Sequence, residues 1–552
     1  MNANRYSKII VVFFVTMFVM LVFSQADKKF VLDELDFPIV AKATSETLKP
    51  IYYRGEGQEE HLGLYHPPLY IYMLGAHIKA FGFSENTVRS FGLICTLITT
   101  LLTAILGSRI SQLSPWIFIP IFVALYLSNP YTIASTTLPD IDQSILPPLF
   151  VLYLIFLFDN KRERVLMTTF TVLLWTKLTT PLALIPFSLI YWHFQKQSIS
   201  ELVLRGIRVF GGALLFFLVS YWVYCELFGL PFSYTFDFLL HSFSKGSGAS
   251  DFTYIVDKIL QNFKYSTGFL ASITYPFAVL FVISLILNIS KIKTDANASK
   301  IFGLGCLTVF VAVFYCGLIA PFGGFFKYPF PVFELACLVI SLTAVSYVRD
   351  CSRFNYFLIA LIFISGCCVF VLQVKYLGDH KMLAVFFERE FLVNIISASL
   401  VVFITLLFFI VSRRFSAIIL SVMIGCVIGL GLGVSRFHSI SPYPTKYNYG
   451  QLGFEETVEY LKQRLLPGEI IWSMKDIGFY SGNRYVESYS YYFDSDVEKK
   501  ILSLSENNIR YFVATKQIGE DRLDAYPMVL ASLEKCCLLD KSFGNYYIYR
   551  KK

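Results

Sequence analysis

Charged side chains are scarce in this 552-residue sequence, where they make up 16% of the residues against 55% for hydrophobic ones. Soluble domains carry about 25% charged residues, so this shortage argues against a soluble globular protein. The mean hydropathy of +0.59 supports the same conclusion. The net charge of +8 is spread along the chain, and this pattern does not indicate a nucleic-acid-binding surface.

The sequence also lacks the short motifs of nucleotide-binding and hydrolytic sites. It contains no P-loop, no G-x-S-x-G and no H-E-x-x-H pattern, so it does not suggest the use of a cytoplasmic nucleotide. Its 11 cysteines include no C-x-x-C element of the kind that binds metal. Several cysteines stand inside apolar runs as small core residues, and we expect no disulfide framework.

Long apolar runs, in contrast, recur along most of the chain. A membrane-spanning helix needs about 20 apolar residues, and the repeated runs predict a polytopic α-helical membrane protein. The expected spans lie near residues 8–24, 88–107, 116–133, 142–158, 165–193, 209–228, 269–289, 301–320, 330–348, 355–374, 391–411 and 416–435.

The first of these runs has two interpretations. Arg5 and Lys8 precede it, and the small residues Ser24 and Ala26 follow it, as they would at a signal-peptide cleavage site. The alternative, which we favour, is an uncleaved first helix that anchors the loop after it. In either case the basic residues place the N-terminus in the cytoplasm.

The run 165–193 is long for one span and contains Lys177, Pro181 and Pro186. A single crossing would move the Lys and Arg residues of the later short loops to the outer side. A broken hairpin of two short helices keeps them in the cytoplasm, as the positive-inside rule requires. We therefore expect about thirteen membrane segments, with the C-terminus outside.

This topology predicts a membrane domain over residues 1–436, with a large first outer loop over residues 25–86. A second outer loop covers about residues 229–267. Residues 437–552 form a small extracytoplasmic α/β domain. Its expected helices are Phe454–Leu465 and Val497–Ser503, and its expected strands are Glu469–Ser473, Tyr511–Ala514 and Tyr546–Tyr549.

The first outer loop begins with an acidic stretch, Leu32-Asp33-Glu34-Leu35-Asp36, just past the first span. A carboxylate beside apolar surface has a raised pKa, which suits proton abstraction from a hydroxyl group. Asp33, with Glu34 beside it, is therefore a candidate general base at the membrane face. The alternative is that both residues only solvate an outer loop.

A second acidic site, Leu138-Pro139-Asp140-Ile141-Asp142, stands at the outer start of a predicted span. Ionisable groups at such depth are costly and often functional. Asp140 and Asp142 are candidates for holding an acceptor or a divalent cation, the one cofactor that the sequence suggests. His66 in the first loop is a further candidate for this role. The alternative is that Asp140 is the N-cap of the following helix.

Three basic residues are expected on or near the outer face, although the positive-inside rule favours such residues in the cytoplasm. They are Arg89, Lys177 and Lys327. Lys327 is followed by Tyr328 at the mouth of a span. Cations in this position are suited to hold a lipid phosphate. The alternative is that these side chains snorkel from helix ends to the interface.

The order of these motifs resembles that of a known group of enzymes. The acidic pair is followed by His-Pro-Pro-Leu-Tyr, by Phe-Gly-x-Ser-Glu before an Arg, and by Leu-Pro-Asp at the fourth span. Thr-Lys-x-Thr and Lys-Tyr-Pro-x-Pro come later. Over residues 8–350 the sequence resembles the GT-C class of membrane glycosyltransferases. It is most similar to the protein O-mannosyltransferase and aminoarabinose transferase-like group, glycosyltransferase family 39-like.

This resemblance implies a transferase that takes a sugar from a polyprenyl-phosphate carrier and passes it to an acceptor glycan, lipid or protein. The reaction would take place on the outer face of a membrane, which we expect to be the bacterial inner membrane. By resemblance, Asp33 is the general base and Glu34 the adjacent acid. Asp140 lies near the acceptor or a metal. The lipid phosphate would be held by Arg89, Lys177, Lys327 and Tyr328.

Two other classes of function remain as alternatives. A transporter or flippase of lipid-linked sugars would need polar residues through the membrane midplane, which most of these spans lack, and the chain shows no internal repeat. A non-catalytic assembly protein of the cell envelope would not need the acidic and basic residues to converge. The glycosyltransferase is therefore the predicted function.

Overall fold

In the computed structural model the chain divides into two compact units. Unit 1 comprises residues 1–26, 64–70 and 89–440, and unit 2 comprises residues 27–63, 71–88 and 441–552. The structure describes residues 3–30, 32–53, 55–56, 61–62, 66–111, 115–195, 198–233, 235–237, 271–293, 295–314, 330–348, 352–376, 413–440, 452–482, 484–493, 496–505, 508–518, 521–522 and 526–552.

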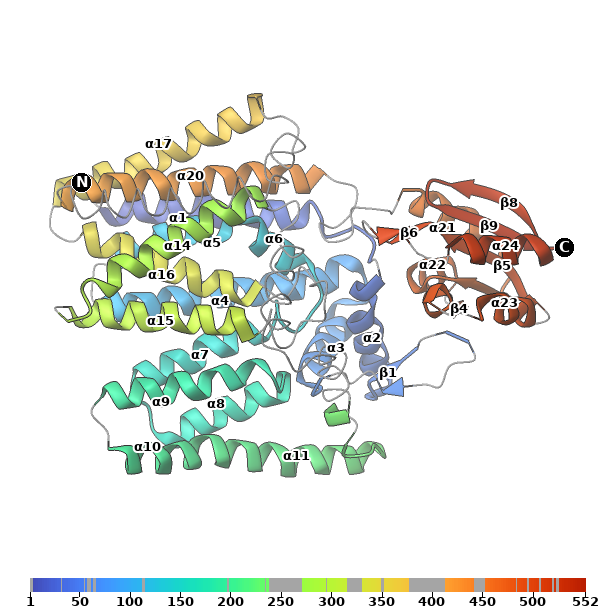
Figure 1. Cartoon of the computed structure of the whole chain (residues 1–552), viewed down its shortest axis with the longest axis horizontal. Helices are drawn as coiled ribbons and strands as arrows, with labels where there is room; N and C mark the ends of the chain where they lie inside the picture. The colour runs from blue at the N-terminus through green and yellow to red at the C-terminus, as the bar shows by residue number, and fades with distance from the viewer. Residues whose placement is uncertain are drawn as a thin grey trace. The chain divides into compact units, whose positions relative to one another are not determined.

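Unit 1 is built from helices (Figure 1), as its apolar runs predict. These are α1 (Ala3–Phe23), α4 (Glu85–Ser111), α5 (Pro115–Leu127), α6 (Pro130–Thr137), α7 (Leu146–Phe158), α8 (Glu163–Thr176), η2 (Thr180–Ala183), α9 (Leu184–Phe194), α10 (Ile199–Gly206), η3 (Ile207–Gly211), α11 (Gly212–Phe228), α14 (Ala271–Ile289), α15 (Ala296–Val313), α16 (Phe330–Val348), α17 (Ser352–Tyr376) and α20 (Arg413–Ile440).

Within the described residues, four helical segments are long and apolar enough to cross a membrane: Arg5–Phe23, Glu85–Ser111, Ile199–Phe228 and Arg414–Ser435. The pair α5 and α6, bent by 66°, would make a fifth span. Shorter apolar helices lie in five other predicted runs, at Leu146–Phe158, Pro276–Ile289, Asn297–Val313, Phe333–Ser346 and Phe357–Leu372. The predicted run 391–411 lies outside the described residues, as does most of the second outer loop.

The predicted run 165–193 is broken, as expected, at Lys177. α8 ends before this residue, whose backbone is extended (φ −155°, ψ 137°). After η2 the chain reverses its direction. The evidence is that Tyr191, in the last turn of α9, packs on Phe158, close to the residue at which α8 begins. In the middle of the hairpin, Tyr153 of α7 contacts both Phe170 of α8 and Ser188 of α9. The two helices therefore form the predicted hairpin.

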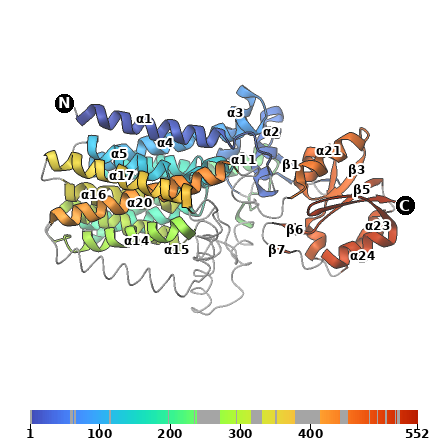
Figure 2. The same cartoon turned by 90° about the horizontal axis from the view of Figure 1, so that it is seen from above.

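α17 and α20 lie side by side (Figures 1 and 2) and meet through glycines. A Cβ atom on Gly429 would lie 2.3 Å from the carbonyl oxygen of Gly366 in α17. One on Gly425, a turn earlier in α20, would lie 2.3 Å from the carbonyl oxygen of Ile362. Small residues at such a spacing let two helix backbones approach closely inside a membrane.

Unit 2 joins elements of the predicted first outer loop to those of the C-terminal tail. The elements that lie in or extend into it from the loop are η1 (Leu32–Leu35), α2 (Asp36–Thr47), β1 (Ile51–Tyr52), β2 (His61–Leu62) and α3 (Leu69–Phe81). The tail elements are α21 (Phe454–Arg464), β3 (Ile470–Ser473), α22 (Lys475–Ser481), β4 (Tyr485–Glu487), η7 (Tyr489–Phe493), α23 (Val497–Ser505), β5 (Ile509–Thr515), β6 (Gln517–Ile518), β7 (Asp521–Arg522), α24 (Tyr526–Cys536), β8 (Cys537–Phe543) and β9 (Tyr546–Lys551).

The tail forms a five-stranded sheet in the order β4-β3-β5-β9-β8, with β3 parallel to β4 and β5 and the remaining pairs antiparallel. Side chains alternate across it. Trp472 and Phe512 face a core with α23 and α24, whereas Ile471 and Tyr511 face a core with α21 and α22. Figure 2 shows α21 on one side of the sheet and α23 and α24 on the other. The helices and strands predicted for the tail are all present.

Candidate active site

The predicted catalytic acids stand in a short 3-10 turn, η1, that leads directly into α2. Glu34 is buried, with 1% of its side chain exposed. Asp33 lies in the same turn, but its side chain falls outside the described residues. A carboxylate buried at this depth needs hydrogen-bonding or charged partners. The turn therefore holds at least one acidic side chain away from water.

Asp36, the third acid of this stretch, is the better described one. Its Oδ1 atom accepts hydrogen bonds from the Tyr52 hydroxyl and from the Lys475 ammonium, each at 2.6 Å. Burial raises the pKa of Tyr52, and the Asp36 carboxylate raises it further. The Tyr52 hydroxyl therefore stays protonated and donates to Asp36 over the whole physiological pH range. Asp36 thus has a structural role, because it links Tyr52 and Lys475 to the loop. The sequence alone did not distinguish this role from those of the neighbouring acids Asp33 and Glu34.

In unit 1, the predicted residues Asp142 and Lys177 lie against each other. The Lys177 Nζ atom is 2.7 Å from Oδ1 and 2.5 Å from Oδ2 of Asp142. Each side chain is only 3% exposed. The break between α8 and α9 supplies the lysine, and the turn before α7 supplies the aspartate. Because both side chains are almost completely buried, each charge depends on the other for a partner.

Asp140 holds the turn that carries Asp142. Its Oδ1 atom accepts the backbone N–H of Asp142 at 3.3 Å, and its carbonyl oxygen accepts a hydrogen bond from the Ser144 hydroxyl. The interpretation of Asp140 as a helix cap is wrong. α7 begins only at Leu146, with Ile145 as a cap residue that makes no side-chain bond. The short aspartate side chain bonds two residues ahead, in a turn, before the helix can start.

Tyr70, at the start of α3, lies close to this turn. Its hydroxyl bonds to Ser144, and its pKa is raised well above the ordinary value by burial first and by the Asp140 carboxylate second. His66 is half-buried in the bend just before α3. The His-Pro-Pro-Leu-Tyr stretch therefore ends, at its tyrosine, beside the Leu-Pro-Asp turn. Two motifs more than sixty residues apart in the sequence meet at this point.

Arg89 is buried in α4, with 1% of its side chain exposed. Its guanidinium donates to the backbone carbonyls of Thr137 and Ala26, each at 3.1 Å. It therefore ties the end of α6 to the end of the first span. Lys327 and Tyr328, the other predicted phosphate ligands, lie outside the described residues.

The predicted residues belong to both units. Asp33 and Glu34 are in unit 2, while His66, Arg89, Asp140, Asp142 and Lys177 are in unit 1. Among the side chains that the structure describes, no three His, Cys, Asp or Glu residues are grouped as they would be around a metal ion. Among the predicted residues whose side chains the structure describes, Asp142 and Lys177 are joined by an ion pair.

Sequence reasoning missed one buried acid in unit 1. Glu334 in α16 is 4% exposed, and its Oε1 atom accepts a hydrogen bond from the Thr103 hydroxyl of α4. Carboxylates inside apolar spans are rare and face the protein interior. Glu334 is the only acidic residue of the run 330–348. A single carboxylate in an apolar run is the sequence signal that could have identified it.

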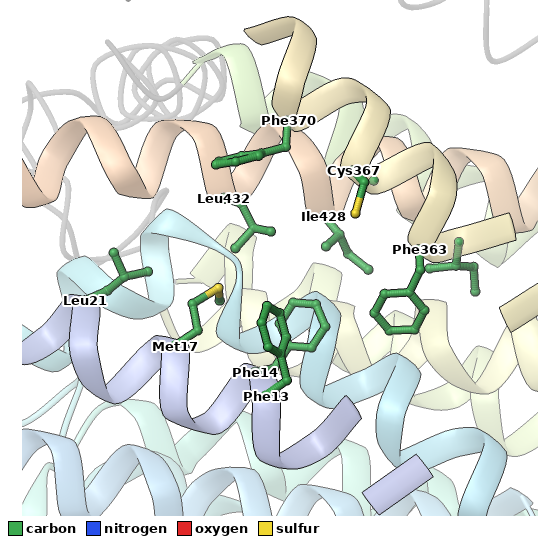
Figure 3. A pocket seen from close by; sticks show the side chains of 11 residues that line it. Phe13, Phe14, Met17, Leu21, Phe363, Cys367, Phe370, Ile428 and Leu432 are labelled. Atoms are coloured by element: carbon green, nitrogen blue, oxygen red, sulfur yellow. The ribbon is translucent and has the colours of Figure 1, made fainter. Parts of the chain in front are cut away.

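A cavity of about 390 Å³ opens between α1, α17 and α20 (Figure 3). The side chains around it are apolar and come from all three helices. Such a lining suits hydrocarbon and offers no partner to a polar group. The residues that line it are Phe13, Phe14, Met17, Leu21, Ile362, Phe363, Gly366, Cys367, Phe370, Ile428 and Leu432.

Comparisons with known proteins add a likeness of fold. No family model matches the chain, and no curated protein matches its sequence. Among solved structures, ArnT from Cupriavidus metallidurans bound to undecaprenyl phosphate matches with a TM-score of 0.56 and 11% identity. The match covers 98% of this chain and 97% of that one. The fold resembles that of ArnT. The apo state of ArnT matches with a TM-score of 0.53 and 12% identity, over the same shares of the two chains.

The likeness to ArnT confirms the predicted resemblance to the GT-C membrane glycosyltransferases at the level of the fold. Together with the apolar helices, it makes this chain an integral membrane protein.

Proposed function

We propose that this protein is a glycosyltransferase that moves a sugar from a polyprenyl-phosphate-linked donor to an acceptor on the outer face of the membrane. The observation that carries the proposal is the shared fold with ArnT, which spans 98% of this chain and 97% of ArnT. The matched ArnT structure holds undecaprenyl phosphate, the lipid part of such a donor. The order of the acidic and basic motifs in the sequence supports the same class of reaction.

The chemistry needs three contributions from the protein. The donor is already activated by its phosphate ester, so no nucleotide is consumed. The enzyme must place the acceptor hydroxyl in line with the sugar C1 atom, accept its proton, and stabilise the leaving phosphate. We assign proton abstraction to Asp33, with Glu34 beside it. Phosphate binding is assigned to Arg89, Lys177, Lys327 and Tyr328, and binding of the acceptor or of a divalent cation to Asp140, Asp142 and His66.

The ion pair of unit 1 fits this assignment. Asp142 fixes the Lys177 ammonium in a buried site. A preorganised cation of this kind stabilises a developing phosphate charge without the reorganisation that water would need. Besides the acceptor or cation role assigned to it above, the Asp142 carboxylate then positions Lys177, which is the group that meets the phosphate.

For the arrangement in the membrane we propose about thirteen segments, a cytoplasmic N-terminus and an extracytoplasmic tail, in a bacterial inner membrane. The short basic loops support this orientation. A tag on the C-terminus that impermeant reagents reach in intact spheroplasts would agree with it. A tag that is reached only after lysis would invert it.

The decisive experiment is transfer of a labelled sugar from a polyprenyl-phosphate donor to a membrane acceptor by the purified full-length protein. We expect Asp33→Asn to lower turnover by about 10²-fold or more, because general-base catalysis contributes a factor of this size. Asp27→Asn is the matched control, since it makes the same chemical change at an exposed residue six positions earlier.

Unchanged turnover in the Asp33 variant would remove this residue as the base. The two rival functions give other results. A flippase would move the labelled donor across a vesicle membrane without consuming it. An assembly protein would neither move nor consume the donor.

A further inference from the structure

The segment that carries Asp33 and Glu34 is held at its N-terminal side by the tail. The backbone N–H of Phe30 donates to the Tyr480 hydroxyl at 2.8 Å. The same hydroxyl donates to Glu85 at 2.8 Å, and the Lys29 ammonium lies 4.6 Å from the centre of the Tyr480 ring. Tyr480 thus contacts the loop three residues before Asp33 and the residue that begins α4.

The same tail helix holds the segment at its C-terminal side. Lys475, the first residue of α22, pairs with Asp36 at 2.6 Å across 439 residues of sequence. The Lys475 side chain is 11% exposed and that of Asp36 21%, so water weakens this pair less than it would a surface pair. Tyr52 donates to the same carboxylate oxygen and fixes its direction.

These contacts enclose a short stretch of chain. Only residues 31–35 lie between the two points at which α22 holds the loop, and they contain both predicted catalytic acids. Fixing a backbone costs conformational entropy at every residue that is ordered. Contacts made at both ends supply this ordering before the substrate arrives. A misplacement of about 1 Å lowers catalysis by about 10²-fold.

We propose that α22 is a brace for the catalytic turn, in which Lys475 and Tyr480 are positioning residues that set the place of Asp33 and Glu34. This inference rests on the proposed function for its catalytic consequence. The tail then has a role in the reaction although it supplies no group to the chemistry. Its two cores give the brace a rigid base, because Ile477 of α22 packs into the sheet core.

A second set of contacts joins the tail to the loop elsewhere and serves as a comparison. Arg484 pairs with Glu56 at 2.8 Å, and the rings of Tyr53 and Tyr485 stack edge to face. These contacts hold the chain just after β1, about twenty residues beyond Asp33. Loss of Arg484 therefore weakens the attachment of the loop without releasing the catalytic turn directly.

The test measures sugar transfer by the full-length protein with Lys475→Met, Lys475→Arg and Arg484→Met. We expect Lys475→Met to lower kcat by about tenfold or more with KM within about twofold, because a misplaced base slows the chemical step and not donor binding. Lys475→Arg keeps the charge and should restore most of the turnover. Arg484→Met should resemble the wild type. If Lys475→Met and Arg484→Met lower kcat equally, both contacts serve only to attach the loop to the tail, and the brace proposal is overturned.

Hydrogen exchange gives a readout that does not depend on activity. Tyr480→Phe removes the acceptor of the Phe30 amide and leaves the ring contacts, so the peptide around residues 28–36 should exchange faster while the sheet stays protected. Unchanged exchange in this variant would contradict the brace. If Lys475→Met does not fold, the exchange measurement on Tyr480→Phe tests the brace in its place.

The two proposals fail in distinguishable ways. If the wild type transfers no sugar, the proposed function falls, and the exchange experiment still decides on the brace. If Asp33→Asn is inactive while Lys475→Met turns over like the wild type, the brace is wrong and the proposed function stands.

Discussion

At the scale of single residues, the ion pair of Lys177 and Asp142 is the contact with the largest consequence in unit 1. Both side chains are 3% exposed, so both have lost their hydration. Their attraction compensates for this loss only while both are present. Arg109 and Asp159 form a chemically similar pair, but their side chains are 47% and 26% exposed. Comparing the stability effects of mutating these two ion pairs therefore separates the contribution of burial from that of charge.

We expect Lys177→Met to lower the free energy of unfolding by about 3–5 kcal/mol, because it leaves the Asp142 carboxylate buried without its cation. The double variant Lys177→Met with Asp142→Leu should regain much of this loss. Arg109→Met should cost at most about 1 kcal/mol. Thermal unfolding of the purified proteins in detergent measures all three. A loss in Lys177→Met no larger than in Arg109→Met would show that burial adds nothing to this pair.

At the scale of elements, the structure separates what local pattern determines from what packing determines. Apolar run length predicted the helices of unit 1, and the polar and proline residues around Lys177 predicted the break between α8 and α9. Helix α2 was not predicted, although five of its twelve residues are buried. The contact of α17 with α20 was not predicted either, since glycines in one run do not identify the helix that they face.

This contact gives a test at the same scale. Gly429→Ala should lower the thermal stability of the protein and its yield of monodisperse material, because the added Cβ atom would lie 2.3 Å from the Gly366 carbonyl oxygen. Backbone atoms of two helices cannot give way as the end of a side chain can. Gly303→Ala in α15 is the control, because its nearest neighbour is a Phe187 ring carbon at 4.0 Å. Equal stability of both variants would contradict the close helix contact.

At the scale of the whole molecule, unit 2 is assembled from three separate stretches of chain. Ion pairs join the first of these stretches to the third, and one of them contains a carboxyl group with a shifted pKa. The hydrogen bond from Arg484 is the main cause that lowers the pKa of Glu56 below its ordinary value. A carboxyl group whose pKa is lower in the folded state stabilises that state above its unfolded pKa. This stabilisation is lost as the pH falls through the folded value.

Wild type should therefore be more heat-stable than Glu56→Gln at pH 7, and the difference should shrink as the pH falls below about 4.3, the ordinary pKa of a glutamate. The expected gap is small, because the Glu56 side chain is 32% exposed and water screens the pair. Melting curves of both proteins between pH 3 and pH 7 measure it. A gap that does not change with pH would mean that the Glu56 charge contributes no stability here.

The sequence by itself predicted the fold class of this protein and named the candidate residues of its site. Both follow from local properties: apolar run length, the positions of charges relative to the runs, and the order of short motifs. Asp33, Asp140 and Lys177 were predicted as site residues in this way, and so were α21, α23, β3, β5 and β9 of the tail.

Only the tertiary structure decided which of these residues meet. The pairing of Lys177 with Asp142 joins a helix break to a turn 35 residues away, and that of Lys475 with Asp36 crosses 439 residues. Such contacts depend on how whole helices and a sheet pack, because the free energy that closes these long loops comes from buried surface elsewhere in the fold. No local pattern of residues records it.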